Sequence, residues 1–502
     1  MAFFPAGIFP VQYFRAKKTI NTNDKDSRGG GQPPPWIGEL RLAGNGEARA
    51  HRVLGALKSA AACGARRLVC SALVQNIGAL YLIRCAAYVA PLLTLPWLAR
   101  VLGPHGLGLL AFVQGIGACV ILIVEYGFSF SATQEVSVHR HSPERLSAIL
   151  AGVQGSKAVL AAACVVCAAV LQPVIPMLEG RQWLLAAGLF AATGQAFTMT
   201  WYFLGIERMM AQSVLEAVLR LGAAAAVLVL VHQPGDAWKV FALQGLAAWL
   251  TAGAGMVMAY RMAPFQWPTP ALVKQSLSRG SGALFFRVAE TSYTSCNALL
   301  LGFLFPANVV GVYASAERIA RSILIALLDP VQRAVYPGVA RALAVSQAAA
   351  ARLVRLSAVA TVTTAVAISA LLFAAAPAVV RVLLGPGYEP SVPVLRLLLV
   401  VPVAVALKWA LGLNWMIPLG QGRAFNAVIA GSAVFHLAAT FTLAARWGAL
   451  GMAATVAVTE AAIPACVYLI LRRRELDPFL QVRPSAAIPE FQHDPERKVP
   501  CC

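Results

Sequence analysis

Charged side chains inside long apolar segments are the residues of this chain whose types and positions could do chemistry. An ionised side chain at mid-membrane costs about 2.5 to 3.5 kcal/mol on insertion scales, so these groups are expected to line an internal space rather than face lipid. Arginine and lysine in such a space suit a phosphate or pyrophosphate, arginine through its planar fork and lysine as a point charge. Away from the ends of the predicted spans, the residues concerned are Arg84, Glu125, Lys157, Glu216, Arg220, Arg287, Glu290, Glu317, Arg318, Arg321, Lys408, His436 and Glu460.

Sequence spacing separates two locally paired cations from the others. Arg220 follows Glu216 by four residues, which is the favourable order for a helical ion pair. Arg321 follows Glu317 in the same way, and for both pairs neutralisation and function stay equally open. The remaining charges are mostly cations, so the sequence predicts a water-filled, cationic cavity that accepts an anionic head group. Its predicted lining residues are Arg84, Lys157, Arg220, Arg287, Arg318, Arg321 and Lys408. Function is favoured most for Arg84 and Lys157, which have no partner nearby in sequence.

Three acidic residues are candidates for carrying a coupling ion, on residue type alone: Glu125, Glu290 and Glu460. His436 is interpreted as a packed or hydrogen-bonded side chain rather than a ligand. No cofactor, metal site or catalytic residue is predicted. The cysteines lack the convergent ligands that a metal site needs, and the sequence has no phosphate-binding G-x-x-x-x-G-K-[ST] loop.

The composition places these charges in a membrane protein. Of the 502 residues, 59% are hydrophobic and 12% are charged, whereas roughly a quarter are charged in an ordinary soluble protein. The net charge of +20 is spread between the apolar segments, without the basic and aromatic patterns of nucleic-acid binding, so it is interpreted as an orientation signal. The sequence therefore predicts an integral membrane protein that does not bind nucleic acid.

Apolar segments of about twenty residues, the length that a helix needs to cross the hydrocarbon core, alternate with short polar turns from residue 71 onward. They predict an all-α fold of about twelve transmembrane helices in two six-helix bundles. The predicted spans are 72–99, 106–131, 146–171, 182–205, 210–232, 238–260, 281–305, 309–331, 354–376, 392–413, 424–445 and 449–471.

Polar and basic stretches divide the chain around these spans. The expected organisation is a disordered basic tail (1–70), a first bundle (71–262), a cytoplasmic linker (263–280), a second bundle (281–471) and a cytoplasmic tail (472–502). Basic residues are more frequent in the loops that share a side with both tails, so both termini are expected to be cytoplasmic.

A short internal echo is consistent with duplicated halves. Residues 108–116 and 311–319 have glycine, alanine and isoleucine at the same offsets, and each stretch opens the second span of its half. Related halves of this kind are common in transporters that rock one bundle against the other. The echo is too short to prove duplication by itself.

Four stretches carry a resemblance to a known family. They are 91–112 (PLLTLPWLARVLGPHGLGLLAF), 125–136 (EYGFSFSATQEV), 201–208 (WYFLGIER) and 310–318 (VGVYASAER), the last continuing to Asp329-Pro330 and Tyr336-Pro337. In order and spacing they resemble the Wzx-type O-antigen and polysaccharide flippases, part of the superfamily of multidrug, oligosaccharidyl-lipid and polysaccharide exporters.

This resemblance implies a function. Such proteins move undecaprenyl-pyrophosphate-linked oligosaccharides from the inner to the outer face of the bacterial cytoplasmic membrane, by alternating access, for O-antigen, capsule or exopolysaccharide synthesis. The implied partners are the membrane and the lipid-linked oligosaccharide, with a polysaccharide polymerase and a chain-length regulator as candidates. The alternatives are a drug or cation antiporter of the same fold and, less favoured, a membrane-embedded polymerase or glycosyltransferase. An enzyme is not expected, because no large outside loop or soluble catalytic domain is visible.

Overall fold

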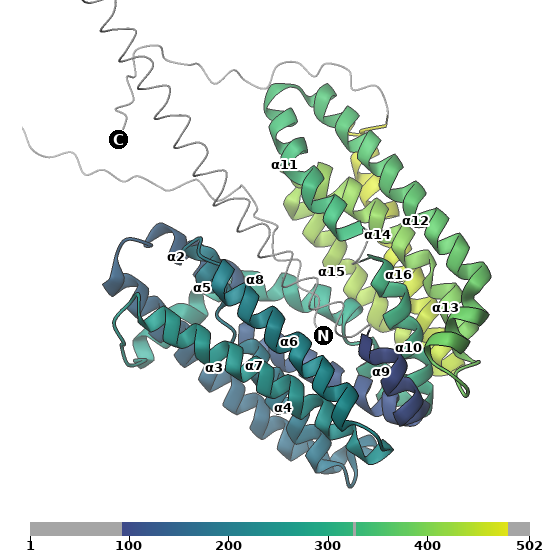
Figure 1. Ribbon diagram of the computed structural model, residues 1–502. Helices are drawn as coiled ribbons and strands as arrows, with labels where there is room; N and C mark the ends of the chain where they lie inside the picture. Colours follow the sequence, from purple (N-terminus) through teal and green to yellow (C-terminus); the bar gives the residue numbers. More distant parts are fainter. Residues whose placement is uncertain (1–92, 325–327, 480–502) are drawn as a thin grey trace, which may run out of the picture.

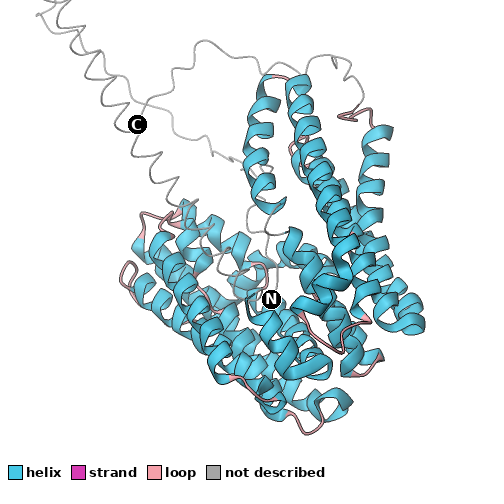
Figure 2. Cartoon of the chain, turned by 45° about the vertical axis from the view of Figure 1, so that its right-hand side comes forward, coloured by secondary structure: helices cyan, strands magenta, loops and turns pink. Residues whose placement is uncertain are grey.

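The computed structural model of the chain describes residues 93–324 and 328–479. This part is helical apart from turns and contains no strand, as Figure 2 shows. Seven of its helical segments are long and apolar enough to cross a membrane. The protein is thus an all-α integral membrane protein, as predicted. Arg84, most of the first predicted span and the tail 1–70 lie outside the described residues.

The first half of the chain begins with helical residues 93–125. Gly103 interrupts this stretch with a φ of +65°, a backbone conformation that glycine adopts without strain, and so separates the first two predicted spans. The helices that follow are α2 (Phe128–Val138), α3 (Pro143–Leu171), α4 (Gln182–Ala196), α5 (Thr200–Gly205), α6 (Met210–Leu230) and α7 (Ala237–Tyr260). The fourth predicted span is therefore divided between α4 and α5.

The second half contains more interruptions. Its helices are α8 (Pro270–Thr294), α9 (Asn297–Leu304), α10 (Ala307–Ile323), α11 (Asp329–Val345), α12 (Gln347–Leu383), α13 (Ser391–Leu398), α14 (Val400–Lys408), α15 (Gly422–Ala439) and α16 (Ala445–Arg473). A π-helical segment, Trp409–Met416, continues α14, and Gly448 kinks the start of α16 with a φ of +55°. Breaks of this kind inside a membrane are tolerated where the freed backbone groups find partners within the protein.

The helices gather into two lobes. In Figure 1, α2 to α7 form one lobe and α10 to α16 form the other. The lobes approach each other at the end that carries α9 and α10, and they diverge toward the end that carries α2 and α11. The largest buried apolar cluster contains Phe112 from the first half together with Val310 and Tyr313 from the second, so the core is continuous across the junction.

Helix α8 joins the two lobes, which differs from the predicted linker 263–280. Residues 270–280 are the first turns of α8, because Pro270 occupies its first position and the Thr269 hydroxyl accepts a hydrogen bond from the Leu272 amide at 3.4 Å. The helix packs against α2 and α3 of the first lobe and against α15 of the second. Whether residues 263–280 face the cytoplasm stays a prediction.

Two glycines form a close contact between the halves. A Cβ atom on Gly108 would overlap the carbonyl oxygen of Ala307, and a Cβ atom on Gly311 would overlap that of Pro104. The contact is reciprocal, since each carbonyl belongs to the residue four positions before the other glycine. These are the glycines of the internal echo, so the two matching stretches cross each other at the junction. Small residues allow this close approach of helix backbones in membranes.

Candidate functional site

Helix α8 carries a buried ion pair to the first half of the chain. Arg287 Nη1 lies 2.9 Å from Glu125 Oε2 and donates to Ser129 Oγ at 3.1 Å. The side chains of Arg287 and Glu125 are only 8% and 14% exposed. This arginine is therefore neutralised by a carboxylate from another helix.

Lys157 of α3 lies near the same pair. It is 1% exposed, and its ammonium group donates a 2.6 Å hydrogen bond to the carbonyl oxygen of Ala196, the last residue of α4. The indole ring of Trp201 lies 5.9 Å from the Nζ atom, and Glu125 and Arg287 are within electrostatic range. Lys157 is thus held by the first lobe itself.

A second buried ion pair lies in the other lobe. Lys408 Nζ, at the end of α14, is 2.7 Å from Glu460 Oε2 of α16. The same Nζ atom lies 5.6 Å from the centre of the Tyr293 ring of α8, a cation–π distance.

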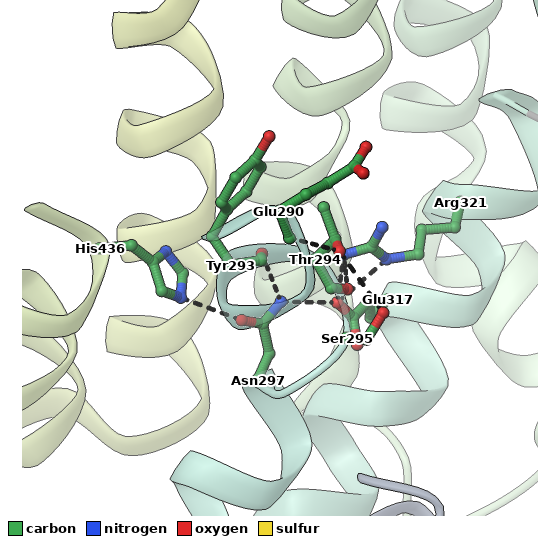
Figure 3. A network of polar contacts seen from close by, with 8 residues as sticks. All are labelled: Glu290, Tyr293, Thr294, Ser295, Asn297, Glu317, Arg321 and His436. Atoms are coloured by element: carbon green, nitrogen blue, oxygen red, sulfur yellow. Dashed lines mark hydrogen bonds and ion pairs between the residues drawn. The ribbon is translucent and has the colours of Figure 1, made fainter. Parts of the chain in front are cut away.

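Glu290 of α8 lies between the two ion pairs. It is within electrostatic range of Arg287, Lys408 and Glu460. Its carboxylate has no hydrogen bond or ion pair within the described residues, and Figure 3 shows it apart from the contacts around it. Charged side chains from both halves of the chain therefore come together along α8. Among them, the carboxylate of Glu290 has no fixed partner within the described residues and is available to pair with a neighbouring cation.

The break between α8 and α9 is filled by a polar network (Figure 3). Asn297 donates to Glu317 Oε1 at 3.0 Å, and its Oδ1 lies 3.0 Å from His436 Nε2. Arg321 contacts Glu317 at 2.9 Å and donates to the carbonyl oxygen of Thr294 at 2.5 Å. The network thus satisfies backbone oxygen that the helix break leaves without a helical partner.

His436 makes a hydrogen bond through each ring nitrogen. Its Nδ1 atom is 3.1 Å from Thr459 Oγ1, and the residue is fully buried. The interpretation of His436 as a hydrogen-bonded structural residue is therefore confirmed.

Two further predicted cations lie elsewhere. Arg318 of α10 donates to Gln114 Oε1 of the first half, close to the glycine crossing. Arg220 of α6 lies 2.8 Å from Glu216 and donates to Gln195 Oε1 at 3.0 Å, within the first lobe. Neither arginine lies in the ion pairs along α8.

The structure pairs cations that sequence spacing left without a partner. Four of the predicted cavity residues pair with glutamates in the described part of the chain: Arg220, Arg287, Arg321 and Lys408. Two of these glutamates lie on distant stretches of sequence, so helical spacing could not reveal them. Sequence analysis also missed Gln114 and Ser129, although an amide or a hydroxyl in an apolar span was an available signal. Within residues 93–324 and 328–479, no group of three or more His, Cys, Asp or Glu side chains could hold a metal ion.

Comparisons with known proteins agree with this architecture. The family described as polysaccharide biosynthesis protein matches residues 73–343. A protein of Escherichia coli K12 described as a candidate O-antigen transporter is 25% identical over 80% of this chain and 97% of its own length. A protein of Shigella dysenteriae with the same description is 24% identical over 78% of this chain and 97% of its own.

Two solved structures share the fold. The lipid II flippase MurJ in an inward closed conformation matches with a TM-score of 0.61 at 8% identity, covering 80% of this chain and 87% of that one. An inward-facing multidrug transporter of the MATE family matches with a TM-score of 0.59 at 15% identity, covering 80% and 98%. At these identities the likeness concerns the fold alone.

Proposed function

The chain belongs to the polysaccharide biosynthesis protein family, and from this premise we propose that it is a flippase for lipid-linked oligosaccharides. Its cargo would be an oligosaccharide unit on undecaprenyl pyrophosphate, moved to the outer face of the cytoplasmic membrane for O-antigen, capsule or exopolysaccharide synthesis. Similarity to the candidate O-antigen transporters over most of their length supports this assignment. We propose a polysaccharide polymerase and a chain-length regulator as partners, and a cytoplasmic location for both termini.

The observation that carries the proposal is the row of charges along α8. Arg287 and Lys408 are held by Glu125 and Glu460, and both cations lie within electrostatic range of Glu290. A pyrophosphate offers oxygen atoms that can replace a carboxylate at arginine or lysine. In the proposed mechanism, the pyrophosphate takes over one or both cations, while the polyprenyl chain stays in the bilayer. Arg84, Lys157 and Arg318 add positive charge to the pathway in this proposal.

In this mechanism, the pyrophosphate and a carboxylate take turns as the partner of the same cation, which explains why paired cations suit a flippase. A cation without any partner would be expensive to bury and would bind the cargo too tightly to release it. A carboxylate that competes for the same cation returns when the cargo leaves. Movement of the lobes about the glycine crossing of Gly108 and Gly311 would then expose the site to each side in turn.

Flipping of a fluorescent polyprenyl-pyrophosphate oligosaccharide in vesicles that contain only this protein tests the proposal. An Arg287→Gln variant should lose at least about tenfold in rate, since a charge-assisted contact contributes roughly 1.5 to 3 kcal/mol. The single variant leaves the Glu125 carboxylate without its arginine and can therefore lose stability as well. A double variant, Glu125→Gln with Arg287→Gln, removes both charges, so it should fold normally and still lack transport.

Other results would favour the alternatives. Normal flipping by a folded double variant would contradict a role for this ion pair in transport. Uptake of an organic cation without movement of any lipid-linked sugar would support the antiporter. Covalent lengthening of the glycan would support a polymerase or glycosyltransferase.

Glu290 is the proposed site of ion coupling, because its carboxylate has no fixed partner within the described residues. A Glu290→Gln variant should lose the stimulation of flipping by a pH gradient, since the amide cannot take up and release a proton. Flipping would be measured in vesicles with and without the gradient. Glu179→Gln, at an exposed glutamate between α3 and α4, is the matched control. Full stimulation of the Glu290 variant would assign coupling to another group.

A further inference from the structure

A separate pocket lies at one end of the first lobe, away from the charges along α8. It has a volume of about 330 Å³ and forms where the α2–α3 turn, the α5–α6 turn and the end of α7 come together. Its lining includes Arg140, His141, Leu146, Tyr202, Arg208 and Met262. The proposed transport mechanism uses none of these residues.

The rim of the pocket is basic and open to solvent. Arg208 is exposed, and Arg140 is 45% exposed and lies 3.2 Å from Glu207. Arg140 Nε also donates to His141 Nε2 at 3.2 Å. With Glu207 counted, the two arginines leave a net positive charge even when His141 is neutral. Both arginines keep guanidinium surface for a second acceptor.

The residues that line the pocket include a buried tyrosine. Tyr202 is fully buried, and its hydroxyl oxygen makes no hydrogen bond within the described residues. A buried polar group left in this way is costly, and an acceptor atom in the pocket would satisfy it after a small shift of the wall exposes the hydroxyl. Helix α3 also begins here, at Pro143, with no side chain capping its first turn, and the exposed Glu144 is the acidic residue of that turn. The amino terminus of a helix favours an anion.

The residues around the pocket are of the kinds found at the depth of lipid head groups. Leu146 and Met262 give it an apolar wall. Just beyond Met262, the rings of Phe265 and Trp267 are 57% and 77% exposed and pack edge to face. Exposed aromatic rings beside basic residues are typical of the membrane–water interface. A ligand here could place a phosphate between the arginines and its chains along the apolar wall.

We infer that this pocket binds the phosphate group of an anionic membrane lipid. The arginines contact the phosphate oxygens, the Tyr202 hydroxyl donates to one of them, and the lipid chains remain in the adjoining leaflet. The inference goes beyond transport of the cargo, because it concerns a resident lipid at the surface of one lobe. It also stands if the cargo is different.

Lipid retention by the purified full-length chain in detergent tests this inference, with native mass spectrometry as the readout. Phosphatidylglycerol, phosphatidylcholine and inorganic phosphate are the probes. The unaltered protein should retain phosphatidylglycerol about tenfold more strongly than phosphatidylcholine, and a double Arg140→Gln and Arg208→Gln variant should lose this preference. Arg145→Gln, at an exposed arginine on the same turn of α3, should behave as the unaltered protein.

A Tyr202→Phe variant gives an independent test that does not disturb the rim. It removes only a hydroxyl that has no partner within the described residues, so the melting temperature should stay the same or rise while phosphatidylglycerol retention falls several-fold. Equal retention of both lipids by the unaltered protein would overturn the inference, as would an equal loss in the Arg145 variant. If inorganic phosphate binds and phosphatidylglycerol does not displace it, the pocket is a site for a free anion. That result would overturn the inference that it binds a lipid.

Discussion

Replacing Gly311 with alanine is expected to destabilise the protein by more than about 4 kcal/mol, a loss found only where something essential to the fold is broken. The added methyl group would overlap the carbonyl oxygen of Pro104, which is backbone and cannot rotate away. Relief requires the two helices to separate, and the apolar cluster around Phe112 and Tyr313 would then open. Gly108→Ala should have a similar effect, because the contact is reciprocal. The measurement is the melting temperature in detergent, together with the amount of protein in the membrane.

Gly253→Ala is the matched control. Gly253 lies within α7, and a Cβ atom there would meet nothing within 4 Å. Since alanine favours a helix by up to about 1 kcal/mol over glycine, this variant should be as stable as the unaltered protein or slightly more so. Melting temperatures for Gly311→Ala and Gly253→Ala that do not differ would show that the halves do not depend on this crossing.

The sequence was sufficient for the features that depend on local pattern. Apolar length predicted a helical membrane protein, and the motifs predicted the family, both of which are confirmed. The break at Gly103 follows from the same kind of signal, since the Gly-Pro pair separates two apolar stretches. The helical start at Pro270 was also readable from Thr269 and Pro270, but the polar composition of residues 263–280 favoured a linker.

Long-range pairing could not be read from the sequence. Glu125 and Arg287 are 162 residues apart, so helical periodicity within one span carries no signal of their contact. The same holds for Lys408 and Glu460, 52 residues apart. Counting charges span by span therefore predicted a cationic cavity, and it could not show that the fold pairs four of the predicted cations with carboxylates. Arg84, the cation that sequence analysis favoured together with Lys157, lies outside the described residues and stays a prediction.

Removing Lys408 should destabilise the protein more than removing its partner Glu460. In Lys408→Met, the buried carboxylate of Glu460 loses its partner and Glu290 loses a nearby cation, and breaking a buried ion pair costs about 3 to 5 kcal/mol. In Glu460→Ala, Lys408 still has Glu290 within electrostatic range, and that carboxylate has no fixed partner within the described residues. The expected loss of stability is therefore smaller for the glutamate variant, as measured by thermal unfolding in detergent.

If Glu290 can replace Glu460 as the partner of Lys408, it has a reserve role in this group. Two double variants distinguish this reserve role from a simple loss of charge. Glu290→Gln combined with Glu460→Ala leaves Lys408 without a carboxylate in this group and should approach the full loss of Lys408→Met. Lys408→Met combined with Glu460→Leu removes both charges of the pair and should recover most of the stability, since an apolar replacement of a buried pair is often neutral. Equal melting temperatures for Glu460→Ala with and without Glu290→Gln would contradict the reserve role. If Glu290 does move to Lys408 when Glu460 is absent, then the same movement is available when a pyrophosphate displaces a carboxylate, and one acid can link cargo binding to proton exchange.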